Sequence, residues 1–323
     1  MGDTTDSTSP RVPRYAELPL LSTLKARHAW DHFGRDDQLG TVNRITEDKL
    51  LSSLGEARTG ARINLTLEAS AIDPPLYGRK ALVHTYIESD RNTWDDKFDE
   101  LYPQAGSQWD GLRHIRAREF GFFGGRTANP PDLGADLGVQ VWAERGILTR
   151  GVLLDVERYF RETGDSYDPM TEFSVEPELL VAVAKHQGVQ ILTGDILCVR
   201  FGWLAAYRRL NLEQRAECAE AATSLPFAGL AAGEPMAEAL WDWEVAGVAC
   251  DNPGAEVSPG SAAAGSLHRR LLPLLGLLVG ELFDFDELAE ASARDGRWSF
   301  LLMSVPLNVS GAVGSPANSV AVR

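Results

Sequence analysis

The sequence predicts an α/β protein, because short apolar runs typical of buried strands alternate with segments of helical periodicity. The runs are rich in Val, Ile and Leu, and several are bounded by Gly, Asp or Pro, as strands at the centre of a sheet often are. The predicted strands are Arg62–Leu67, Gly151–Val156, Ile196–Phe201, Val245–Cys250, Leu277–Leu282 and Phe300–Val305.

Two segments between these runs have the spacing of helices. Glu176–His186 repeats apolar residues every three to four positions, and Leu212–Ala222 is rich in Ala and Glu. Asn211 directly precedes the second segment and is a suitable N-cap, since its side-chain oxygen can accept a free backbone N–H. Helices between strands predict a sheet that is covered on both faces over at least part of its width.

The chain is expected to form one domain. Residues 1–12 are rich in Ser, Thr, Asp and Pro and predict a disordered tail. No long linker, low-complexity tract or internal repeat interrupts residues 13–323. The candidate site residues described below run from Gln104 to Glu281 and must meet in one site, which favours a single catalytic domain over two.

Composition excludes several classes of protein. Among 323 residues, 31 Lys and Arg stand against 46 Asp and Glu, so the formal net charge of −15 argues against a nucleic-acid binder. No stretch reaches about 18 uninterrupted apolar residues, so no membrane span is expected. The N-terminus lacks the pattern of a signal peptide, and three widely spaced cysteines form no disulfide framework or zinc knuckle. A cytoplasmic protein is predicted.

The densest group of chemically capable side chains lies in the segment Gln104–His114. Four polar residues fall at even spacings in it: Gln104, Gln108, Asp110 and His114. In an extended segment these side chains would project to one side. A carboxylate and an imidazole four residues apart can share a metal or act as an acid–base pair, although such a group on a polar loop is more often ordinary surface.

A second group follows much later in the chain, at the segment Val248–Glu256, at His268 and at Glu281. Glu281 ends an apolar run, and a carboxylate at the end of a buried strand is costly unless it is paired or bound to a cation. Pairing of Glu281 with Arg269 or Arg270 is the alternative to a metal site, and His268 could simply begin a helix.

Together the two groups resemble the cyclase family, also called the kynurenine formamidase-like or putative cyclase family of metal-dependent hydrolases. Its hallmark is His-x-Gly-Thr-His-x-Asp-x-Pro-x-His, and Gln104–His114 aligns with it without a gap. Gly106, Asp110 and His114 are retained, and Ser107 stands where Thr is usual. Asp37–Thr46 resembles the entry segment of the family's longer branch. Three further segments resemble later blocks of the family: Arg150–Asp155, Gly194–Trp203 and Pro306–Asn318.

The resemblance implies a swivelling β/β/α fold, a subtype of the α/β class, and a set of site residues. In formamidase-type members the two leading His and the Asp of the hallmark hold one metal, and the same Asp with a later His and Glu holds a second. In this sequence Gln104 and Gln108 replace the leading His residues, and an amide oxygen is a poorer ligand than imidazole. We therefore expect one divalent metal, zinc or manganese, on Asp110, His268 and Glu281, with Gln108 and Gln104 as weak ligands, or no metal at all.

The same resemblance implies an enzyme, with His114 as its general acid and base and Asp110 beside it. We expect a kynurenine formamidase-like hydrolase that cleaves an amide or lactone by metal-activated water. Two alternatives stay open: a natural-product cyclase or lyase using Asp110 and His114 without metal, and a non-catalytic scaffold.

The expected partners are a small-molecule substrate and further copies of this chain. Trp109, Phe123 and Arg113 are candidate substrate-binding residues, since aromatic walls and a guanidinium would suit an organic substrate. A homo-oligomer, a dimer or a tetramer, is expected because the family generally forms one, and the segment His28–His32 is a candidate contact.

Overall fold

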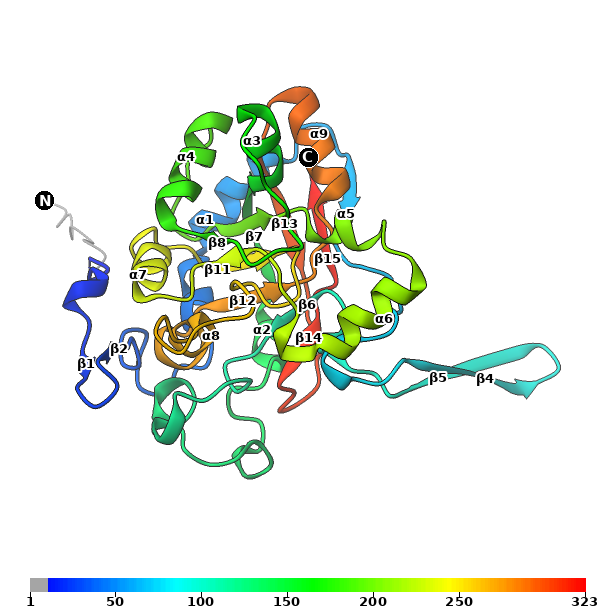
Figure 1. Ribbon diagram of the computed structural model, residues 1–323. Helices are drawn as coiled ribbons and strands as arrows, with labels where there is room; N and C mark the ends of the chain where they lie inside the picture. Colours follow the sequence, from blue (N-terminus) through cyan, green and yellow to red (C-terminus); the bar gives the residue numbers. More distant parts are fainter. Residues whose placement is uncertain (1–10) are drawn as a thin grey trace, which may run out of the picture.

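A mixed β-sheet is the centre of the computed structural model, which describes residues 11–323 (Figure 1). In that part of the chain nine strands form the sheet in the order β14-β6-β12-β11-β9-β7-β13-β15-β3. In chain order they are β3 (Arg62–Asn64), β6 (Gln108–Asp110), β7 (Ile147–Asp155), β9 (Ile196–Arg200), β11 (Gly247–Cys250), β12 (Leu278–Glu281), β13 (Ser299–Ser304), β14 (Gly314–Pro316) and β15 (Ser319–Val322). Strands β12, β11, β9 and β7 are parallel, and the strands outside them pair antiparallel.

The six predicted strands are confirmed as β3, β7, β9, β11, β12 and β13, with boundaries that differ by a few residues. Every residue of β9, β11 and β12 is buried. A strand that is buried at every position must be covered on both faces, which is why these strands show continuous apolar runs instead of alternation. The strands that were not predicted, β6, β14 and β15, are short and contain Gln, Asp, Ser or Pro.

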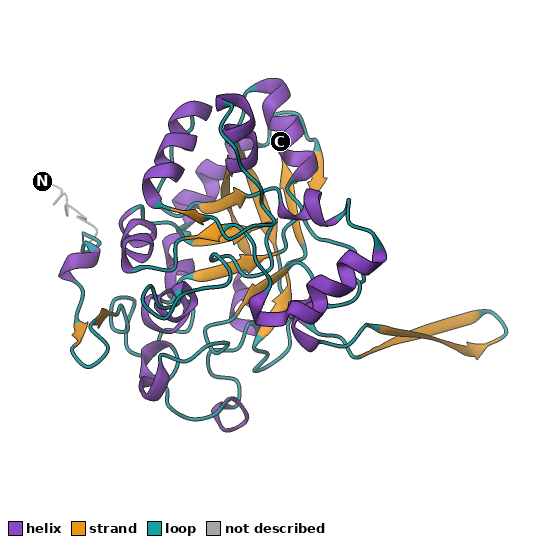
Figure 2. Ribbon diagram, in the orientation of Figure 1, coloured by secondary structure: helices purple, strands orange, loops and turns teal. Residues whose placement is uncertain are grey.

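Helices surround the sheet (Figure 2). They are α1 (Glu47–Ser53), α2 (Gln140–Arg145), α3 (Val156–Thr163), α4 (Pro177–Gln187), α5 (Trp203–Tyr207), α6 (Leu212–Ala221), α7 (Glu234–Asp242), α8 (Leu267–Arg270) and α9 (Asp286–Asp295). The two predicted helices are confirmed as α4 and α6. Asn211 caps α6 as expected, since its side chain accepts the backbone N–H of Gln214 at 2.9 Å.

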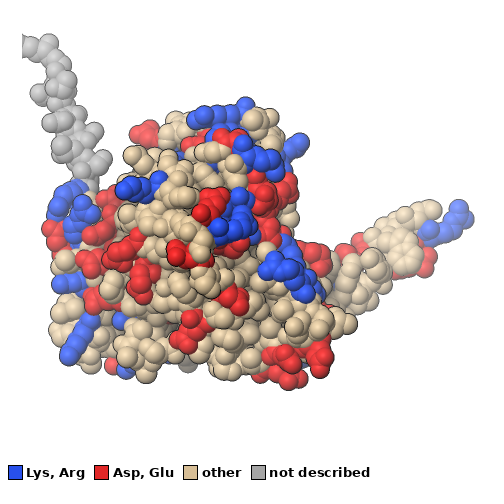
Figure 3. All heavy atoms as spheres, turned by 45° about the horizontal axis from the view of Figure 1, so that its top comes forward, with Lys and Arg blue, Asp and Glu red and all other residues tan. Residues whose placement is uncertain are grey.

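Three small two-stranded sheets complete the described part of the chain. β1 (Leu20–Leu21) pairs with β2 (Ala26–Arg27), and β8 (Ser174–Val175) pairs with β10 (Gly229–Leu230). The third, a hairpin of β4 (Val83–Asp90) and β5 (Thr93–Asp99), projects away from the body of the molecule (Figures 1 and 3). The hairpin was not predicted, because its sequence mixes charged and aromatic residues without a buried face.

Most of the predicted tail, residues 1–12, lies outside the described residues. Its last residue, Val12, is partly buried against the core. The buried core has one large cluster across the sheet and its helices, and a smaller one that includes Trp203, Tyr207 and Phe227. Between residues 11 and 323, none of the helices has the length and apolar character needed to cross a membrane.

Candidate active site

The register between β6 and β12 brings the first two candidate site residues together. Gln108 lies directly opposite Glu281, and Asp110 lies opposite Val279. Since side chains alternate along a strand and opposite residues share a face, Gln108, Asp110 and Glu281 project to the same side. The Gln108 amide nitrogen donates a hydrogen bond to Glu281 Oε2.

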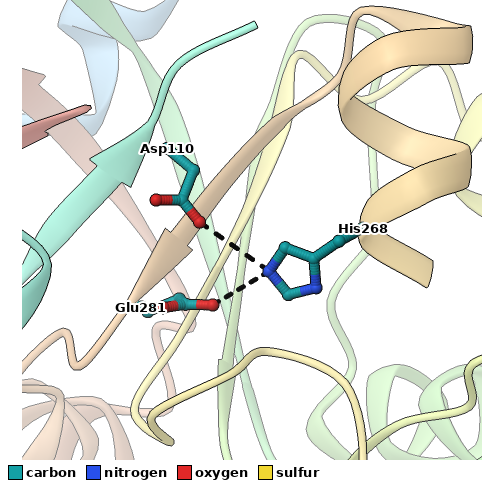
Figure 4. A group of neighbouring side chains, drawn as sticks. All are labelled: Asp110, His268 and Glu281. Atoms are coloured by element: carbon teal, nitrogen blue, oxygen red, sulfur yellow. Dashed lines mark hydrogen bonds and ion pairs between the residues drawn. The ribbon is translucent and has the colours of Figure 1, made fainter. Parts of the chain in front are cut away.

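His268 reaches this cluster from α8, a separate element of the chain (Figure 4). Its Nε2 lies 3.0 Å from Glu281 Oε1 and 3.7 Å from Asp110 Oδ2. All three side chains are buried, and one ligand atom of each lies within 4.8 Å of the others. The structure therefore brings together the three residues that the sequence predicted as ligands.

Glu256 holds His268 from the other side. The His268 Nδ1 lies 2.6 Å from Glu256 Oε1, and the same carboxylate accepts the backbone N–H of Leu267 at 2.6 Å. The hydroxyl of Ser266 donates to Glu256 at 3.0 Å. One carboxylate thus fixes both the start of α8 and the orientation of the imidazole ring.

The loop that carries Glu256 is itself anchored to the sheet. Both carboxylate oxygens of Asp251 accept backbone N–H groups, from Phe201 at 2.7 Å and from Gly202 at 2.8 Å. Asn252 donates to the carbonyl of Ala228 at 2.8 Å. These contacts connect the end of β11 to the end of β9, so the position of Glu256 depends on the packing of the parallel strands.

Electrostatics of the cluster follow from three carboxyl groups around one imidazole. Burial, and then the charge of Glu281, raise the pKa of Asp110 to about 6. Burial disfavours the imidazolium, but hydrogen bonds to Glu256 and Glu281 outweigh it and raise the pKa of His268 well above its usual value. Burial would also raise the pKa of Glu256, yet the hydrogen bond with His268 dominates and lowers it.

The donor set fits a divalent cation. Gln108 Oε1 and Asp110 Oδ1 are buried and have no hydrogen-bond partner among the described residues. Unpaired buried oxygens are costly, and the carboxyl groups outnumber the imidazole, so a positive ion would satisfy both the free oxygens and the charge. One imidazole with two carboxylates suits zinc or manganese, and a carboxylate on the second ring nitrogen is common where histidine binds metal.

His114 stands at the edge of the cluster. Its Nε2 lies 3.8 Å from Asp110 Oδ1, and its side chain is 27% exposed, whereas that of Asp110 is 1% exposed. The predicted extended segment ends at Asp110: a turn follows, in which the backbone N–H of His114 donates to Gly111 O at 2.9 Å. The turn, rather than strand alternation, brings the imidazole back toward Asp110.

The described geometry can be compared with known proteins. The family model described as "Putative cyclase" matches residues 63–257, more than half of the chain. The chain belongs to this cyclase family.

Solved structures show the same fold. A protein described as a novel cyclase has a TM-score of 0.79 and 28% identity, covering 92% of this chain and 99% of its own. Isatin hydrolase A from Labrenzia aggregata has a TM-score of 0.57 and 16% identity, covering 85% of this chain and 97% of its own. Isatin hydrolase A from Ralstonia solanacearum has a TM-score of 0.55 and 16% identity, with coverage of 85% and 97%. No curated protein sequence matches the chain.

These likenesses confirm the predicted cyclase-type α/β fold.

Within the cyclase-family hallmark, the two glutamines occupy different positions. Gln108 belongs to the cluster, whereas Gln104 precedes β6 in a short 3₁₀ turn, Pro103–Ala105, and is partly buried. The carbonyl of Gln104 accepts a hydrogen bond from Arg79 at 2.7 Å. Among the described residues, no hydrogen bond joins the Gln104 side chain to Asp110, His268 or Glu281.

The three candidate substrate-binding residues are all buried, at 0% to 2% exposure. Trp109 projects from β6 to the face opposite Asp110, where its Nε1 donates to Ser304 at 2.8 Å. Phe123 is completely buried. The Arg113 guanidinium donates to the carbonyls of Gly134 and Asp136, both at 2.9 Å. The direction of the Trp109 side chain follows from strand alternation. Successive side chains of a strand point to opposite faces of the sheet, so a residue next to Asp110 points away from the site.

Sequence reasoning missed the role of Glu256. Its segment, Val248–Glu256, was named with the second group of candidate residues. Nothing in the spacing of Glu256 and His268 indicates a direct contact, because the intervening loop sets the distance. The alternative pairing of Glu281 with Arg269 or Arg270 is not found among the described residues. Arg270 instead donates to the carbonyls of Ala232 and Ser266.

Proposed function

We propose that this protein is a hydrolase that adds water across the C–N bond of an amide or the C–O bond of a lactone in a small molecule. The observation that carries the proposal is the convergence of Asp110, His268 and Glu281, with His114 as the most exposed group beside them. The cluster combines cation ligands and a proton carrier, the two elements that hydrolysis of a carbonyl compound requires.

Asp110, His268 and Glu281 would hold one divalent cation, zinc or manganese, and the free Oε1 of Gln108 is available as a weak fourth donor. Gln104 is the weaker candidate, since no hydrogen bond joins its side chain to the cluster in the described residues. When bound, such a cation polarises a carbonyl group and lowers the pKa of water. The Glu256 carboxylate is hydrogen-bonded to Nδ1 of His268, so Nε2 is the ring nitrogen that faces the proposed cation.

His114 is the proposed general acid and base. It takes a proton from the attacking water as the oxygen forms its bond to the carbonyl carbon, and it returns that proton to the nitrogen or oxygen that leaves. An imidazole suits this role because its ordinary pKa of about 6.5 lies near neutral pH. Asp110 Oδ1 lies 3.8 Å from His114 Nε2, which is within ion-pair distance but longer than a hydrogen bond, so the carboxylate stands beside the ring that carries the proton.

The fold relatives support a cyclic amide as the first substrate to test. Two of them are isatin hydrolases, and isatin is a cyclic amide. An N-formyl arylamine, the formamidase-type substrate, and a lactone complete the panel. The three compounds present the same carbonyl chemistry with different leaving groups, so relative turnover identifies which bond the protein cleaves.

The proposed compartment is the reducing cytoplasm. The three cysteines, Cys198, Cys218 and Cys250, are buried and free. Free, buried thiols are typical of proteins from reducing compartments.

Metal analysis tests the proposal most directly. Protein purified without chelator is expected to contain about one equivalent of zinc or manganese per chain. His268→Ala should lose that metal, and His186→Ala, which removes a surface histidine paired with Glu162 at 2.8 Å, should keep it. Absence of metal, with no rise in thermal stability when zinc or manganese is added, contradicts the metal hydrolase.

The two alternatives predict different results in the same experiments. A metal-free cyclase or lyase would lose turnover when His114 is replaced but would not respond to metal. A non-catalytic scaffold would bind a small molecule with unchanged affinity after the same replacement.

A further inference from the structure

One tyrosine beside the candidate active site has no part in the mechanism described so far. Tyr77 is the central residue of the short 3₁₀ turn Leu76–Gly78, which precedes β4 in the chain. Its ring is partly buried and packs against the smaller core cluster. That cluster includes Leu282, the residue that directly follows Glu281. The turn therefore packs on the same core cluster as the end of β12.

The phenol hydroxyl of Tyr77 reaches the loop that carries Glu256. A Cβ added to Gly254 would lie 3.7 Å from the hydroxyl oxygen, and Gly254 is two residues before Glu256. A larger residue at this position would stand against the hydroxyl, so glycine keeps that side of the oxygen free. The oxygen therefore lies near the loop whose carboxylate fixes His268.

This hydroxyl is a free donor. Between residues 11 and 323, no hydrogen bond of the Tyr77 hydroxyl is found. Other enclosed tyrosines are bonded: the Tyr207 hydroxyl donates to Asp73 O at 3.3 Å, and the Tyr167 hydroxyl donates to Phe201 O at 3.0 Å. Because a tyrosine hydroxyl usually finds a partner when its ring is buried, a free one beside a candidate site is available to a ligand.

The backbone of Tyr77 has an uncommon conformation. Its φ of 60° and ψ of 30° lie in the left-handed region, and Gly78 follows with a φ of 70°. Glycine adopts this region freely, but a bulky side chain there is an outlier. Residues held in such conformations are concentrated at active sites and ligand-binding sites. The conformation therefore favours a role for the Tyr77 side chain beyond packing.

Arg79 contacts the Tyr77 ring and joins it to the cyclase hallmark. The central carbon of the guanidinium lies over the ring, 5.0 Å from its centroid. The Nη1 of the same group donates to Gln104 O at 2.7 Å. Stacking on an aromatic face and donation to a carbonyl together hold both groups in place. The position of the ring thus depends on Arg79.

Electrostatic interactions connect both side chains to the candidate ligands. Burial raises the pKa of Tyr77, the charge of Glu281 raises it further, and Arg79 opposes them. For Asp110, burial is the main cause of the raised pKa, and the charge of Arg79 is among those that oppose it. A phenol with a raised pKa stays protonated at neutral pH, so Tyr77 can donate its proton in a hydrogen bond.

We propose that the Tyr77 hydroxyl is a further catalytic group, which donates a hydrogen bond to the carbonyl oxygen of the substrate, and that Arg79 is its positioning residue. This inference rests on the hydrolysis proposed above. As the water oxygen bonds to the carbonyl carbon, the π electron pair moves to the carbonyl oxygen, which accepts the O–H of Tyr77. When the C–N or C–O bond breaks, that pair forms the C=O bond again, and His114 gives its proton to the leaving atom.

Such a donor acts mainly on the rate of the chemical step. The carbonyl oxygen gains charge only as the new bond forms, so the hydrogen bond is stronger in the transition state than with bound substrate. A donor that the fold already holds in place needs no rearrangement at that moment. Removing one donor of this kind typically lowers kcat by about 10²–10³-fold. The effect on KM should be small.

The first test is Tyr77→Phe in the metal-loaded protein. This change keeps the ring and removes only the hydroxyl. With isatin, an N-formyl arylamine and a lactone as substrates, kcat should fall about 10²-fold on every compound that the wild type cleaves. KM, metal content and the thermal midpoint should stay unchanged. A kcat within twofold of the wild type overturns the proposal.

Tyr207→Phe is the matched control. Tyr207 belongs to the same smaller core cluster, and its hydroxyl donates to a backbone carbonyl. Its removal should leave kcat unchanged. An equal loss of kcat in both variants would mean that any missing hydroxyl in this cluster disturbs the site, and the specific role of Tyr77 would be wrong.

A double-mutant cycle tests the positioning role of Arg79. Arg79→Gln should lower kcat at least tenfold with little change in KM, and Arg79→Lys should restore part of the loss because it keeps a cation near the ring. In Tyr77→Phe with Arg79→Gln, kcat should be close to that of Tyr77→Phe alone, since Arg79 acts through the hydroxyl. Losses that multiply would show that Arg79 acts by another route.

Binding of the ring-opened carboxylate of isatin separates this inference from the proposed reaction. A carboxylate oxygen can accept the same hydrogen bond, so Tyr77→Phe should raise its Kd at least fivefold in calorimetry, and Tyr207→Phe should not. If the wild type cleaves none of the three compounds but this difference is found, the hydrolysis is wrong and the contact of Tyr77 with a carbonyl-type oxygen stands. An equal Kd in wild type and Tyr77→Phe, or no binding to the wild type, overturns the contact.

Discussion

Gln108 and Glu281 are direct partners across β6 and β12, and the amide nitrogen of Gln108 donates a hydrogen bond to the Glu281 carboxylate. This donor partly compensates the buried charge of Glu281 at the position where formamidase-type relatives are expected to carry a metal-binding histidine. The exchange of imidazole for amide thus leaves Glu281 paired and keeps it beside His268.

Removing that amide should destabilise the protein. Gln108→Leu keeps approximately the same volume but leaves Glu281 Oε2 without its donor, so we expect a loss of about 1–3 kcal/mol in the free energy of unfolding. Urea unfolding of chelator-treated protein measures it. A free energy of unfolding equal to that of the wild type would show that the Glu281 carboxylate does not depend on this donor.

Replacing the partner of His268 should weaken metal binding. Glu256→Gln removes the carboxylate at 2.6 Å from Nδ1, and we expect metal affinity to fall by about 10–100-fold. Competition with a metal-binding dye measures the affinity. Glu162→Gln breaks a comparable pair with the surface residue His186 and is the matched control; its affinity should equal that of the wild type.

His114→Asn should separate catalysis from metal binding. We expect kcat to fall by about 10²–10⁴-fold, since the proton carrier is lost, while metal content is unchanged. The loss should appear in kcat rather than KM. A kcat equal to that of the wild type in this variant would assign the proton transfer to another group.

Gly280→Ala tests the packing role of Trp109. A Cβ on Gly280 would lie 2.8 Å from the Trp109 ring and 2.6 Å from the Phe283 ring, closer than real contacts allow. We expect a loss of about 1–3 kcal/mol in the free energy of unfolding, measured in urea. Gly55→Ala is the control, since nothing lies within 4 Å of its added methyl group. Unchanged stability in Gly280→Ala would show that the indole can move away from the core.

Asp251 should give stability a specific pH dependence. Burial, with a further contribution from Asp286, raises the pKa of Asp251 to about 7, although Arg200 and the backbone N–H groups oppose it. Between about pH 4 and pH 7 the folded protein therefore holds a proton that the unfolded chain has lost, so this group lowers stability as pH rises through that window.

Asp251→Asn removes this titration. The fall in the free energy of unfolding between about pH 4 and pH 7 should become less steep, although the loss of one hydrogen-bond acceptor lowers stability overall. Urea unfolding at a series of pH values measures the slope. Glu213→Gln, on the exposed start of α6, is the control. If the free energy of unfolding of Asp251→Asn changes with pH as steeply as that of the wild type, other buried acids cause the pH dependence.

The sequence by itself determined the buried strands at the centre of the sheet and the ligand candidates. Strands such as β9 and β11 are continuous apolar runs because both of their faces are buried, and that pattern is visible without coordinates. Asp110, His268 and Glu281 could be chosen because acids and histidines are unusual beside apolar segments, and the family resemblance connected them.

The tertiary structure alone decided the rest, because it depends on distances between segments that are far apart in the sequence. The register of β6 against β12 sets Gln108 opposite Glu281 and turns Trp109 into the core. The loop after β11 carries Glu256 to the far side of His268. The hairpin of β4 and β5 has no buried face, so its strands lack the alternation of apolar and polar residues by which a strand is recognised in a sequence.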